Sequence, residues 1–550
     1  MKYFLGSLLS IMISISAFAQ NSPGVDYLSL GEIKLAKDYF TKNMGQSPAE
    51  SHYYLGEIAL QEGNTAEAKS HYEKGLAADP ESGLNAIGLA KLELKSNQKE
   101  AENKLKDVQK KNKKDVTVIL AIAKAYLDNG MKDLAMEKLQ DARKADKKDP
   151  NIYIFEGDIL AKENKPGDAA RQYDQAINFD EKCALAYMKG ARVYKDINMD
   201  TAIDMLTKAA QARPDLTIVG KELGDLYRNK GMYGPALEAY KKYFTGGDYT
   251  TEDIIRYAST LYFTGSYDES LTLLEEGLAK EPNNFVLNRL VMYNNNGLKD
   301  YQSGLKAGEK FFNLPLNKGD SILSLDYKVY ANILSEVGNK AKAVEQYKKL
   351  IELAPTDRPL YKEVATFSAD ANNYNDATSL YSKYMELAPD SVDAQDYFIL
   401  GRYYYWGGAE AAKDSISVTP AEAKVKAKDM YTKADAAFAT VAERMPASHL
   451  GVYWRARTNV AMDPESTAGL AKPYYEETIK VILAKEDKDA ADNRPLLEAY
   501  SYLAYYYYLQ FVDHGGKAED KANMKSNAEK VLEIDPENST GKALYDFANQ

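Results

Sequence analysis

Small, aromatic and apolar residues recur along the chain in a fixed order and at fixed spacing. A small residue is followed four positions later by an aromatic residue or leucine, then three positions later by another small or apolar residue, and five positions later by proline. Steps of three and four place these side chains on one face of a helix, and proline ends the helix. Gly, Asn and Asp between such groups, as in "EGNTAEA" and "EVGNKAKA", predict tight turns. The series comprises Ala68/Tyr72/Gly75/Pro80, Ala202/Leu206/Ala209/Pro214, Ser270/Leu274/Gly277/Pro282, Ala343/Tyr347/Leu350/Pro355, Ala377/Tyr381/Tyr384/Pro389 and Ala434/Phe438/Val441/Pro446.

The prolines of this series reveal the length of the repeating unit. Pro214 and Pro282 lie 68 residues apart, twice the 34 residues between Pro355 and Pro389. Twelve positions before most leading small residues of this kind stands another small residue, which predicts a second helix packed closely against the first. These positions hold Gly56, Gly157, Gly190, Gly224, Ala331 and Ala365.

This pattern resembles the tetratricopeptide repeat family, whose 34-residue unit carries Leu-Gly at positions 7 and 8, Tyr at 11, Ala at 20, an aromatic residue at 24 and Pro at 32. The resemblance covers nearly the whole mature chain. It implies an all-α fold, a right-handed superhelical α-solenoid of antiparallel helix pairs with about 12–14 repeats. Such an array buries its core between neighbouring units, so the length of the chain does not require several compact domains.

The repeats predict a division of the chain into blocks. A degenerate unit, with Gly304 and Gly308 where Ala and an aromatic residue belong, precedes a break in the period at "NLPLNKGDS". We therefore expect an N-terminal block at 20–284, the degenerate repeat and break at 285–323, a C-terminal block at 324–538 and a capping helix at 539–550. The C-terminal block carries insertions at 407–424, 462–467 and 513–520.

The N-terminus has the features of a secretory signal peptide at 1–19. Lys2 precedes a largely apolar run that ends in Ala17-Phe-Ala19, which predicts cleavage between Ala19 and Gln20. The alternative is an N-terminal membrane anchor. No cysteine lies near the cut and no later segment has the length of a membrane span. We therefore expect an exported periplasmic protein of a Gram-negative bacterium that is not a lipoprotein and has no integral membrane span.

Charge and rare residue types exclude several classes of function. The formal net charge is −11, so the chain has no general attraction for nucleic acid or anionic lipid. Its single cysteine, Cys183, cannot form an internal disulfide and is expected in the core. The four histidines lack metal-ligand spacing, and no phosphate-binding glycine loop or nucleophile elbow is present. We predict no enzyme activity, metal or cofactor.

Two tyrosine-rich runs, "FILGRYYYWGG" at 398–408 and "YSYLAYYYYLQ" at 500–510, raise the question of a binding site. On the repeat template Tyr404 and Tyr507 occupy position 11, where the side chain packs. Positions 9 and 12 lie on another face, which lines the concave groove in this family. The predicted partner-binding groove therefore consists of Arg402, Tyr405, Tyr505 and Tyr508, with Trp406 next to them. The alternative is that the superhelix or a nearby insertion covers these rings.

The resemblance implies a non-catalytic scaffold that binds protein partners of the cell envelope through this groove, a role compatible with a peripheral membrane complex. Some relatives clamp a C-terminal carboxylate with Lys and Asn, which Lys328 and Asn332 match, but Glu363 in the next unit would repel a carboxylate. We therefore do not expect that clamp. Two alternatives stay open, a glycan- or nutrient-binding envelope protein and a purely structural spacer.

Overall fold

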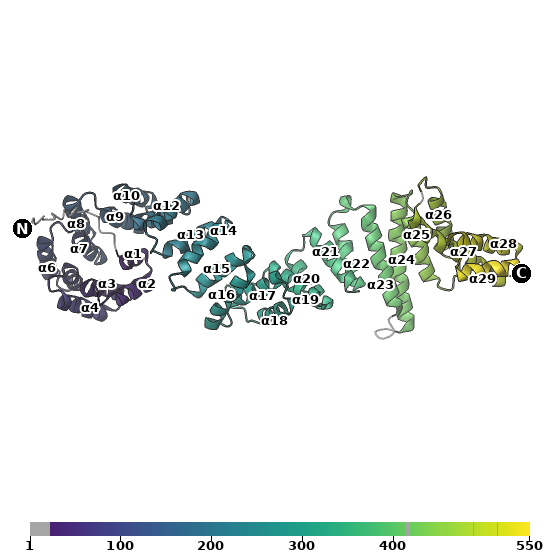
Figure 1. The fold of residues 1–550 in the computed structure, drawn as a ribbon, viewed down its shortest axis with the longest axis horizontal. Helices are drawn as coiled ribbons and strands as arrows, with labels where there is room; N and C mark the ends of the chain where they lie inside the picture. Colours follow the sequence, from purple (N-terminus) through teal and green to yellow (C-terminus); the bar gives the residue numbers. More distant parts are fainter. Residues whose placement is uncertain (1–21, 414–418, 488, 514) are drawn as a thin grey trace, which may run out of the picture. The chain divides into compact units, whose positions relative to one another are not determined.

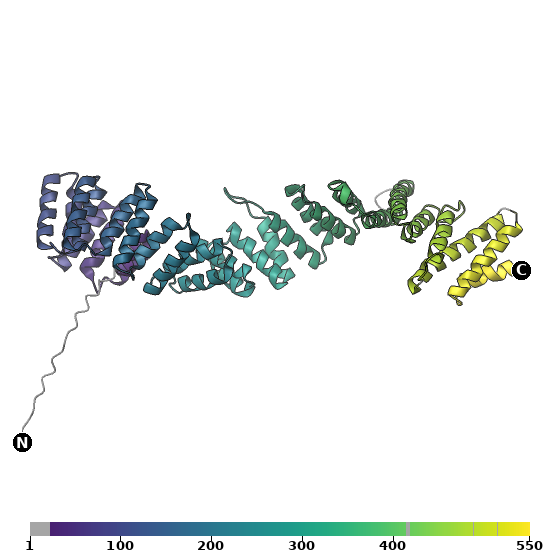
Figure 2. The ribbon, with the colours of Figure 1, turned by 90° about the horizontal axis from the view of Figure 1, so that it is seen from above.

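The computed structural model describes residues 22–413, 419–487, 489–513 and 515–550. The predicted cleavage site, Ala19 and Gln20, lies outside them. Within the described residues the chain forms 29 α-helices and two short 3-10 helices, and it contains no β-strand. Helices α1 to α28 pair consecutively and α29 follows alone (Figures 1 and 2). The chain is an α-solenoid of helix pairs, as the repeat pattern predicts.

The first of two compact units ends at Pro282. Its helices are α1 (Pro23–Leu30), α2 (Ile33–Lys42), α3 (Pro48–Gln61), α4 (Thr65–Ala78), α5 (Gly83–Glu93), α6 (Gln98–Lys111), α7 (Val116–Asp128), α8 (Lys132–Ala145), α9 (Pro150–Lys162), α10 (Pro166–Phe179), α11 (Ala184–Tyr194), α12 (Met199–Ala212), α13 (Ile218–Asn229), α14 (Tyr233–Phe244), α15 (Thr251–Phe263) and α16 (Tyr267–Lys280).

The second unit begins at Asn283. Its helices are α17 (Phe285–Leu298), α18 (Tyr301–Phe312), α19 (Ser324–Glu336), α20 (Lys340–Leu353), α21 (Arg358–Asp370), α22 (Tyr374–Glu386), α23 (Ala394–Lys413), α24 (Pro420–Arg444), α25 (Leu450–Met462), α26 (Lys472–Leu483), α27 (Asn493–Asp513), α28 (Ala518–Ile534) and α29 (Ser539–Asn549). The 3-10 helices are Pro389–Ser391 and Ala490–Asp492.

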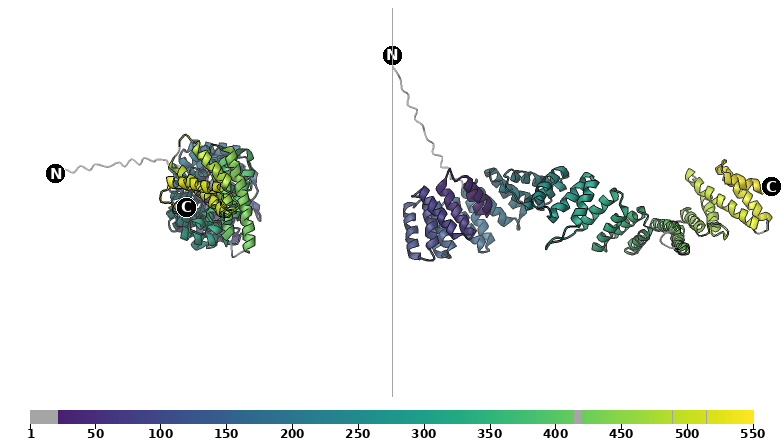
Figure 3. Two further views of the ribbon diagram at one scale, coloured as in Figure 1. Left: turned by 90° about the vertical axis from the view of Figure 1, so that its right-hand side faces the viewer. Right: turned by 90° about the horizontal axis from the view of Figure 1, so that it is seen from below.

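The repeated side chains form the core of each pair. The leading small residues and the aromatic or leucine residues that follow them are buried, among them Ala68, Tyr72, Ala343 and Tyr347. The spacing of small residues predicts that Gly56 faces Ala68 where the two helices cross, but Gly56 faces an aromatic ring. A Cβ added to Gly56 would lie 2.4 Å from the Tyr72 ring, so the glycine makes room for that ring rather than for the alanine. The right-hand view of Figure 3 shows helix pairs stacked along each unit.

The turns between the helices of a pair follow the predicted residues. Gly63 has φ 81° and Asn372 has φ 58°, the left-handed conformation that Gly and Asn tolerate best. Asn64 then caps α4, since its side chain accepts a hydrogen bond of 3.2 Å from the backbone NH of Glu67. Short turns of this kind force consecutive helices to pack side by side.

The unit with the weakest repeat pattern is still a helix pair, α17 and α18. Its two unexpected glycines, Gly304 and Gly308, are buried. A Cβ on Gly308 would lie 2.4 Å from the ring of Tyr330 in α19. The glycine therefore replaces the usual aromatic residue because the following repeat supplies the ring.

The predicted insertion at 407–424 lengthens one helix pair. The structure continues α23 through Gly407 and Gly408 to Lys413, and it starts α24 at Pro420. Both glycines are buried, and a Cβ on Gly408 would lie 2.7 Å from the Tyr431 ring of α24. The glycines thus allow the two extended helices to stay in contact beyond the length of an ordinary repeat.

The first unit also closes on itself through α1, which packs against α11 far along the chain. The Asp26 carboxylate accepts a hydrogen bond of 2.8 Å from Arg213, just before α13. Lys189 and Arg192 of α11 donate hydrogen bonds, each of 2.8 Å, to the carbonyl oxygens of Ser29 and Leu30. These carbonyls end α1, where cations are favoured by the helix dipole.

Candidate partner-binding surface

The run at 398–408 lies on α23, and the repeat packing decides which of its side chains reach the surface. Leu400 and Gly401 are buried, and a Cβ on Gly401 would lie 2.7 Å from the Phe438 ring of α24. Arg402 is exposed, as is Trp406 with 40% of its surface accessible. They are four residues apart and therefore share one face of the helix.

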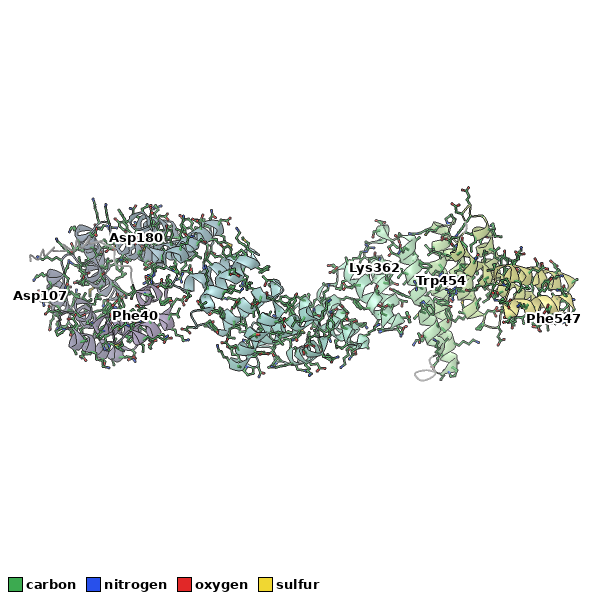
Figure 4. All side chains as sticks on the ribbon, viewed as in Figure 1. Phe40, Asp107, Asp180, Lys362, Trp454 and Phe547 are labelled. Carbon is green, nitrogen blue, oxygen red and sulfur yellow. The ribbon has the colours of Figure 1, made fainter. Side chains whose placement is uncertain are left out.

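Tyr405 is half-buried and lies among other aromatic rings. Its ring centroid is 5.2 Å from that of Trp406 and 5.3 Å from that of Trp454 in α25, with interplanar angles of 81° and 88°. It also lies 5.9 Å from the ring of Tyr431. Such edge-to-face contacts stabilise ring orientation. Tyr405 therefore joins two consecutive odd-numbered helices, α23 and α25, through Trp454, which Figure 4 labels.

Two arginines flank the indole of Trp454. The guanidinium carbon of Arg402 lies 5.8 Å from the Trp454 ring, and that of Arg457 lies 5.0 Å from the same ring. Arg457 is also 6.0 Å from the ring of Tyr405. Cations at these distances are attracted to the aromatic faces. We call Arg402, Tyr405, Trp406, Trp454 and Arg457 the α23–α25 surface.

Sequence reasoning missed Trp454 and Arg457, although a signal for both was present. Ala456 is fully buried and occupies in α25 the place that Gly401 occupies in α23. Arg457 therefore stands at the same repeat position as Arg402. The irregular length of α23 and α24 hid this correspondence, because it breaks the period of 34 residues.

The other two predicted groove residues, Tyr505 and Tyr508, form a separate patch on α27. Tyr505 is 42% exposed, and its ring lies 6.2 Å from that of Tyr508. Tyr508 is half-buried because Phe547 of α29 packs against it at 5.2 Å. In the described part of the chain no ring contact joins this patch to Tyr405 or Trp406, and Figure 4 shows Phe547 well away from Trp454.

Tyr404 and Tyr507 occupy the packing position that the template assigns to them. Both are half-buried; Tyr404 packs on the cluster around Leu400, and Tyr507 on the cluster around Ala504. Lys472 lies 5.2 Å from the ring of Tyr507. The tyrosine runs therefore serve both the repeat core and the surface.

The equivalent face of the first unit is occupied by its own ion pairs. Glu57 is buried, and its carboxylate lies 3.0 Å from Lys91 and 3.1 Å from Lys124 of the next two repeats. It also accepts a hydrogen bond of 2.8 Å from the Tyr72 hydroxyl. Burial alone would raise the pKa of Glu57, but the two lysines lower it below its ordinary value, so the group stays ionised.

The same arrangement recurs along the first unit. The Tyr173 hydroxyl donates to Asp158, which also pairs with Lys189 at 2.9 Å. The Tyr240 hydroxyl donates to Asp225, which pairs with Arg256 at 2.7 Å. The same three groups thus meet in several repeats: a core tyrosine, a carboxylate of its own repeat and a cation of the next repeat. The carboxylate accepts a hydrogen bond from the tyrosine and pairs with the cation.

The remaining candidate residues do not form a chemical site. Lys328 lies 3.9 Å from Glu363, and Asn332 donates to Asn296, so the lysine and asparagine that match a carboxylate clamp are engaged. Cys183 is half-buried, and burial raises the pKa of its thiol to about 12. Over the described ranges no cluster of three or more His, Cys, Asp or Glu could hold a metal, and no helix is long and apolar enough to cross a membrane.

Three segments of the chain match sequence models of the tetratricopeptide repeat, at residues 49–82, 120–184 and 329–357. These three segments are similar to tetratricopeptide repeats. A TPR repeat-containing protein of Methanocaldococcus jannaschii is 24% identical over 335 residues, which is 52% of this chain and 59% of that protein. The chain thus matches less than two thirds of that relative. The TPR repeat-containing protein YpiA of Bacillus subtilis is 20% identical over 51% of this chain and 69% of its own length.

Among solved structures, the C-terminal part of a TPR repeat-containing protein from Cytophaga hutchinsonii is similar. It is 26% identical, covers 53% of this chain and 98% of its own, and has a TM-score of 0.33. Repeats of this family point to a protein-interaction scaffold, and they leave the partner unnamed.

Proposed function

We propose that the protein is a non-catalytic scaffold and that a protein partner docks on the α23–α25 surface. The observation that carries this proposal is the exposed pair Arg402 and Trp406 beside the ordered rings of Tyr405 and Trp454. Arginine and aromatic side chains dominate the energetics of protein interfaces, because they bury a large area and lose little conformational freedom on binding. Here the neighbouring rings already restrict both side chains.

The contrast with the first unit supports this location. There several charged groups of the odd-numbered helices are paired with one another, as Glu57 is with Lys91 and Lys124. A partner would have to break those pairs and leave buried charges uncompensated, which is costly. The Tyr505–Tyr508 patch on α27 is a secondary contact area in this proposal, since α29 covers part of it.

A glycan is the second candidate, and the ring geometry disfavours it. A sugar stacks on an open aromatic face, but the faces of Trp454 are flanked by Phe438 at 5.5 Å and by the Arg402 and Arg457 guanidiniums. The chain has two tryptophans, so Trp406 would be the one exposed indole left for a sugar.

Capture of partners from the cell envelope tests the proposed surface. The tagged wild-type protein and its Trp406→Ala variant are crosslinked mildly in cells and the bound proteins are quantified by mass spectrometry. We expect the partner recovered with the wild type to fall roughly thirtyfold in the variant, the effect of losing a hot spot of ~2 kcal/mol. Phe263→Ala on α15 is the matched control, since Phe263 is a 56% exposed aromatic residue of the first unit.

Two outcomes of this experiment would decide against the proposal. Equal recovery with Trp406→Ala and with the wild type would show that the partner binds elsewhere. Recovery of no specific protein with any variant would favour a structural spacer. A glycan array probed with the wild type separates the second candidate, because binding to a sugar that Trp406→Ala abolishes would make this a glycan site.

The proposed location is the periplasm, after removal of residues 1–19. Lys2, the apolar run and Ala17-Phe-Ala19 motivate it. N-terminal sequencing of the protein from fractionated cells should find Gln20 as the first residue. An intact Met1 on protein from the cytoplasmic fraction would refute export.

A further inference from the structure

The cations on the odd-numbered helices differ in how completely carboxylates balance them. In the first unit Lys91 and Lys124 both lie within 2.6 Å of Asp128 as well as near Glu57, so two lysines meet two carboxylates. Arg256 is paired twice, with Asp225 and with Glu252 at 3.2 Å. These cations have no charge left to offer a ligand.

Of the two guanidiniums of the α23–α25 surface, one has a carboxylate partner. Arg457 lies 3.2 Å from Glu498 of α27. That carboxylate also accepts hydrogen bonds of 2.6 Å from the Tyr453 hydroxyl and 2.8 Å from the Tyr475 hydroxyl. Glu498 is therefore engaged by two hydroxyl donors and one guanidinium.

Arg402 forms no ion pair among the described residues, and its neighbours are the rings of Phe398 and Trp454. The guanidinium is exposed and held by aromatic contacts on α23 and α25. A cation–π contact takes up no conventional hydrogen-bond acceptor, so the NH donors of the guanidinium stay available. Arg402 is thus an oriented donor of hydrogen bonds without an acceptor on the described chain.

We propose that the α23–α25 surface recognises an acidic segment of its partner, in which an Asp or Glu carboxylate pairs with Arg402 and an adjacent apolar or aromatic side chain packs on Trp406. This inference rests on the proposed function and adds the chemistry of the partner. A guanidinium binds a carboxylate through two parallel hydrogen bonds, so the fork geometry selects a planar anion. The exposed indole beside it provides the apolar contact.

The net negative charge of the chain is compatible with an acidic partner segment. The chain carries 81 acidic and 70 basic residues, which would repel an acidic partner at long range. At physiological ionic strength such repulsion is screened over roughly 8 Å, whereas a contact pair at the surface is screened much less. The guanidinium of Arg402, which has no ion pair on the described chain, therefore decides the preference of this surface for an acidic segment.

An anionic membrane is the competing source of negative charge. Lipid surfaces are recognised by clusters of about four to eight basic residues, each adding ~1 kcal/mol. The α23–α25 surface offers two arginines, one of them already paired with Glu498. A single carboxylate matches this site better than a lipid bilayer does.

Selection from a random peptide library on the immobilised full-length protein tests the inference. We expect the selected peptides to be enriched in Asp or Glu next to an aromatic or large apolar residue. A synthetic peptide of the enriched sequence should bind Arg402→Glu at least roughly tenfold more weakly than the wild type, because an attractive pair becomes repulsive. Arg402→Lys should bind more weakly than the wild type but more tightly than Arg402→Glu, because it keeps the charge and loses the fork. Arg171→Glu, which changes an exposed arginine on α10, should retain all of the binding.

The possible results separate the inference from the proposed function. Peptides that lack acidic enrichment, but lose binding in Trp406→Ala, would overturn the inference and leave the docking surface in place. Acidic peptides that bind Arg402→Glu as tightly as the wild type would also overturn it. Peptides that bind Trp406→Ala unchanged would overturn both.

Binding to phosphatidylglycerol vesicles that Arg402→Glu abolishes, with no selected acidic peptide, would replace the inference with a membrane site. Circular dichroism of each variant confirms that it is folded.

Discussion

Asp26 and Arg213 form a buried ion pair across 187 residues of sequence. The Asp26 carboxylate lies 2.8 Å from the Arg213 guanidinium, and only 2% and 7% of the two residues is exposed. This contact joins the first helix of the chain to the segment before α13. It shows that contacts between distant repeats hold the first unit together, in addition to the packing of neighbouring repeats.

The two partners of this pair should differ in their importance for stability. Arg213→Ala leaves the buried Asp26 carboxylate without its guanidinium and should cost roughly 3–5 kcal/mol. Asp26→Asn should cost less, because Arg213 keeps its second carboxylate, Asp215, at 2.9 Å. Chemical denaturation of both variants, with hydrogen exchange of α1 and α11, measures the difference. Equal losses, or no increase of exchange in α1, would contradict a role of the pair in holding α1.

The repeat of α13 and α14 contains one glycine that leaves no room for a side chain and one that does. Gly224→Ala would place a Cβ 2.6 Å from the Tyr240 ring and should cost ~1–3 kcal/mol through overpacking. Gly234 in the same repeat has no atom within 4 Å of an added Cβ, so Gly234→Ala is the matched control. It should be neutral or stabilise by ~0.4–1 kcal/mol. Thermal unfolding of the two variants should rank them in this order, and Tyr240→Leu should relieve the first lesion if the ring causes it.

The buried carboxylate at Glu57 should matter more than the hydroxyl that donates to it. Tyr72→Phe removes one hydrogen bond to an acceptor that keeps two lysines, so we expect a loss of ~0.5–1.5 kcal/mol. Glu57→Ala leaves the buried Lys91 with Asp128 alone and the Tyr72 hydroxyl without this acceptor, and should cost roughly 3–5 kcal/mol. Denaturant titration of both variants tests the order. A Tyr72→Phe variant less stable than Glu57→Ala would contradict it.

The histidine pair of α3 and α4 predicts acid sensitivity. The Nδ1 atoms of His52 and His71 lie 3.0 Å apart, so one ring donates to the other while both are neutral. Burial lowers both pKa values below the ordinary value of 6.5; the charge of His71 and of Lys74 lowers that of His52 further, while Glu67 partly offsets the effect at His71. The unfolded chain therefore binds protons first, and stability should fall as pH drops below about 6.5.

The melting temperature measured between pH 7.5 and 5.5 tests this prediction. His52→Gln should reduce the dependence of the melting temperature on pH, because a neutral amide can donate to neutral His71 and can accept from it once His71 is protonated. His449 of the second unit also has a pKa lowered by burial and should leave a residual dependence. An unchanged pH dependence in His52→Gln would show that the pair does not control the acid response.

The periodic residues of the sequence were sufficient to predict helix pairs, their turns and their core. Gly56 meets the Tyr72 ring within one repeat, and Gly63 turns the chain between the two helices of that repeat. Such contacts span few residues, so each repeat carries its own structural information. The same periodicity assigned Arg402 and Tyr405 to a surface, with Trp406 next to them. In the structure Arg402 and Trp406 are exposed and Tyr405 is half-buried.

The tertiary structure alone decided which distant residues meet. The contact of Tyr405 with Trp454 depends on the extended lengths of α23 and α24, and the pair of Asp26 and Arg213 depends on the summed rotation of several repeats. Each repeat adds a small rotation that no single spacing in the sequence records. The sequence therefore determined the repeat and its core, whereas accumulated packing geometry determined the closure of the first unit and the arginine–tryptophan surface of the second.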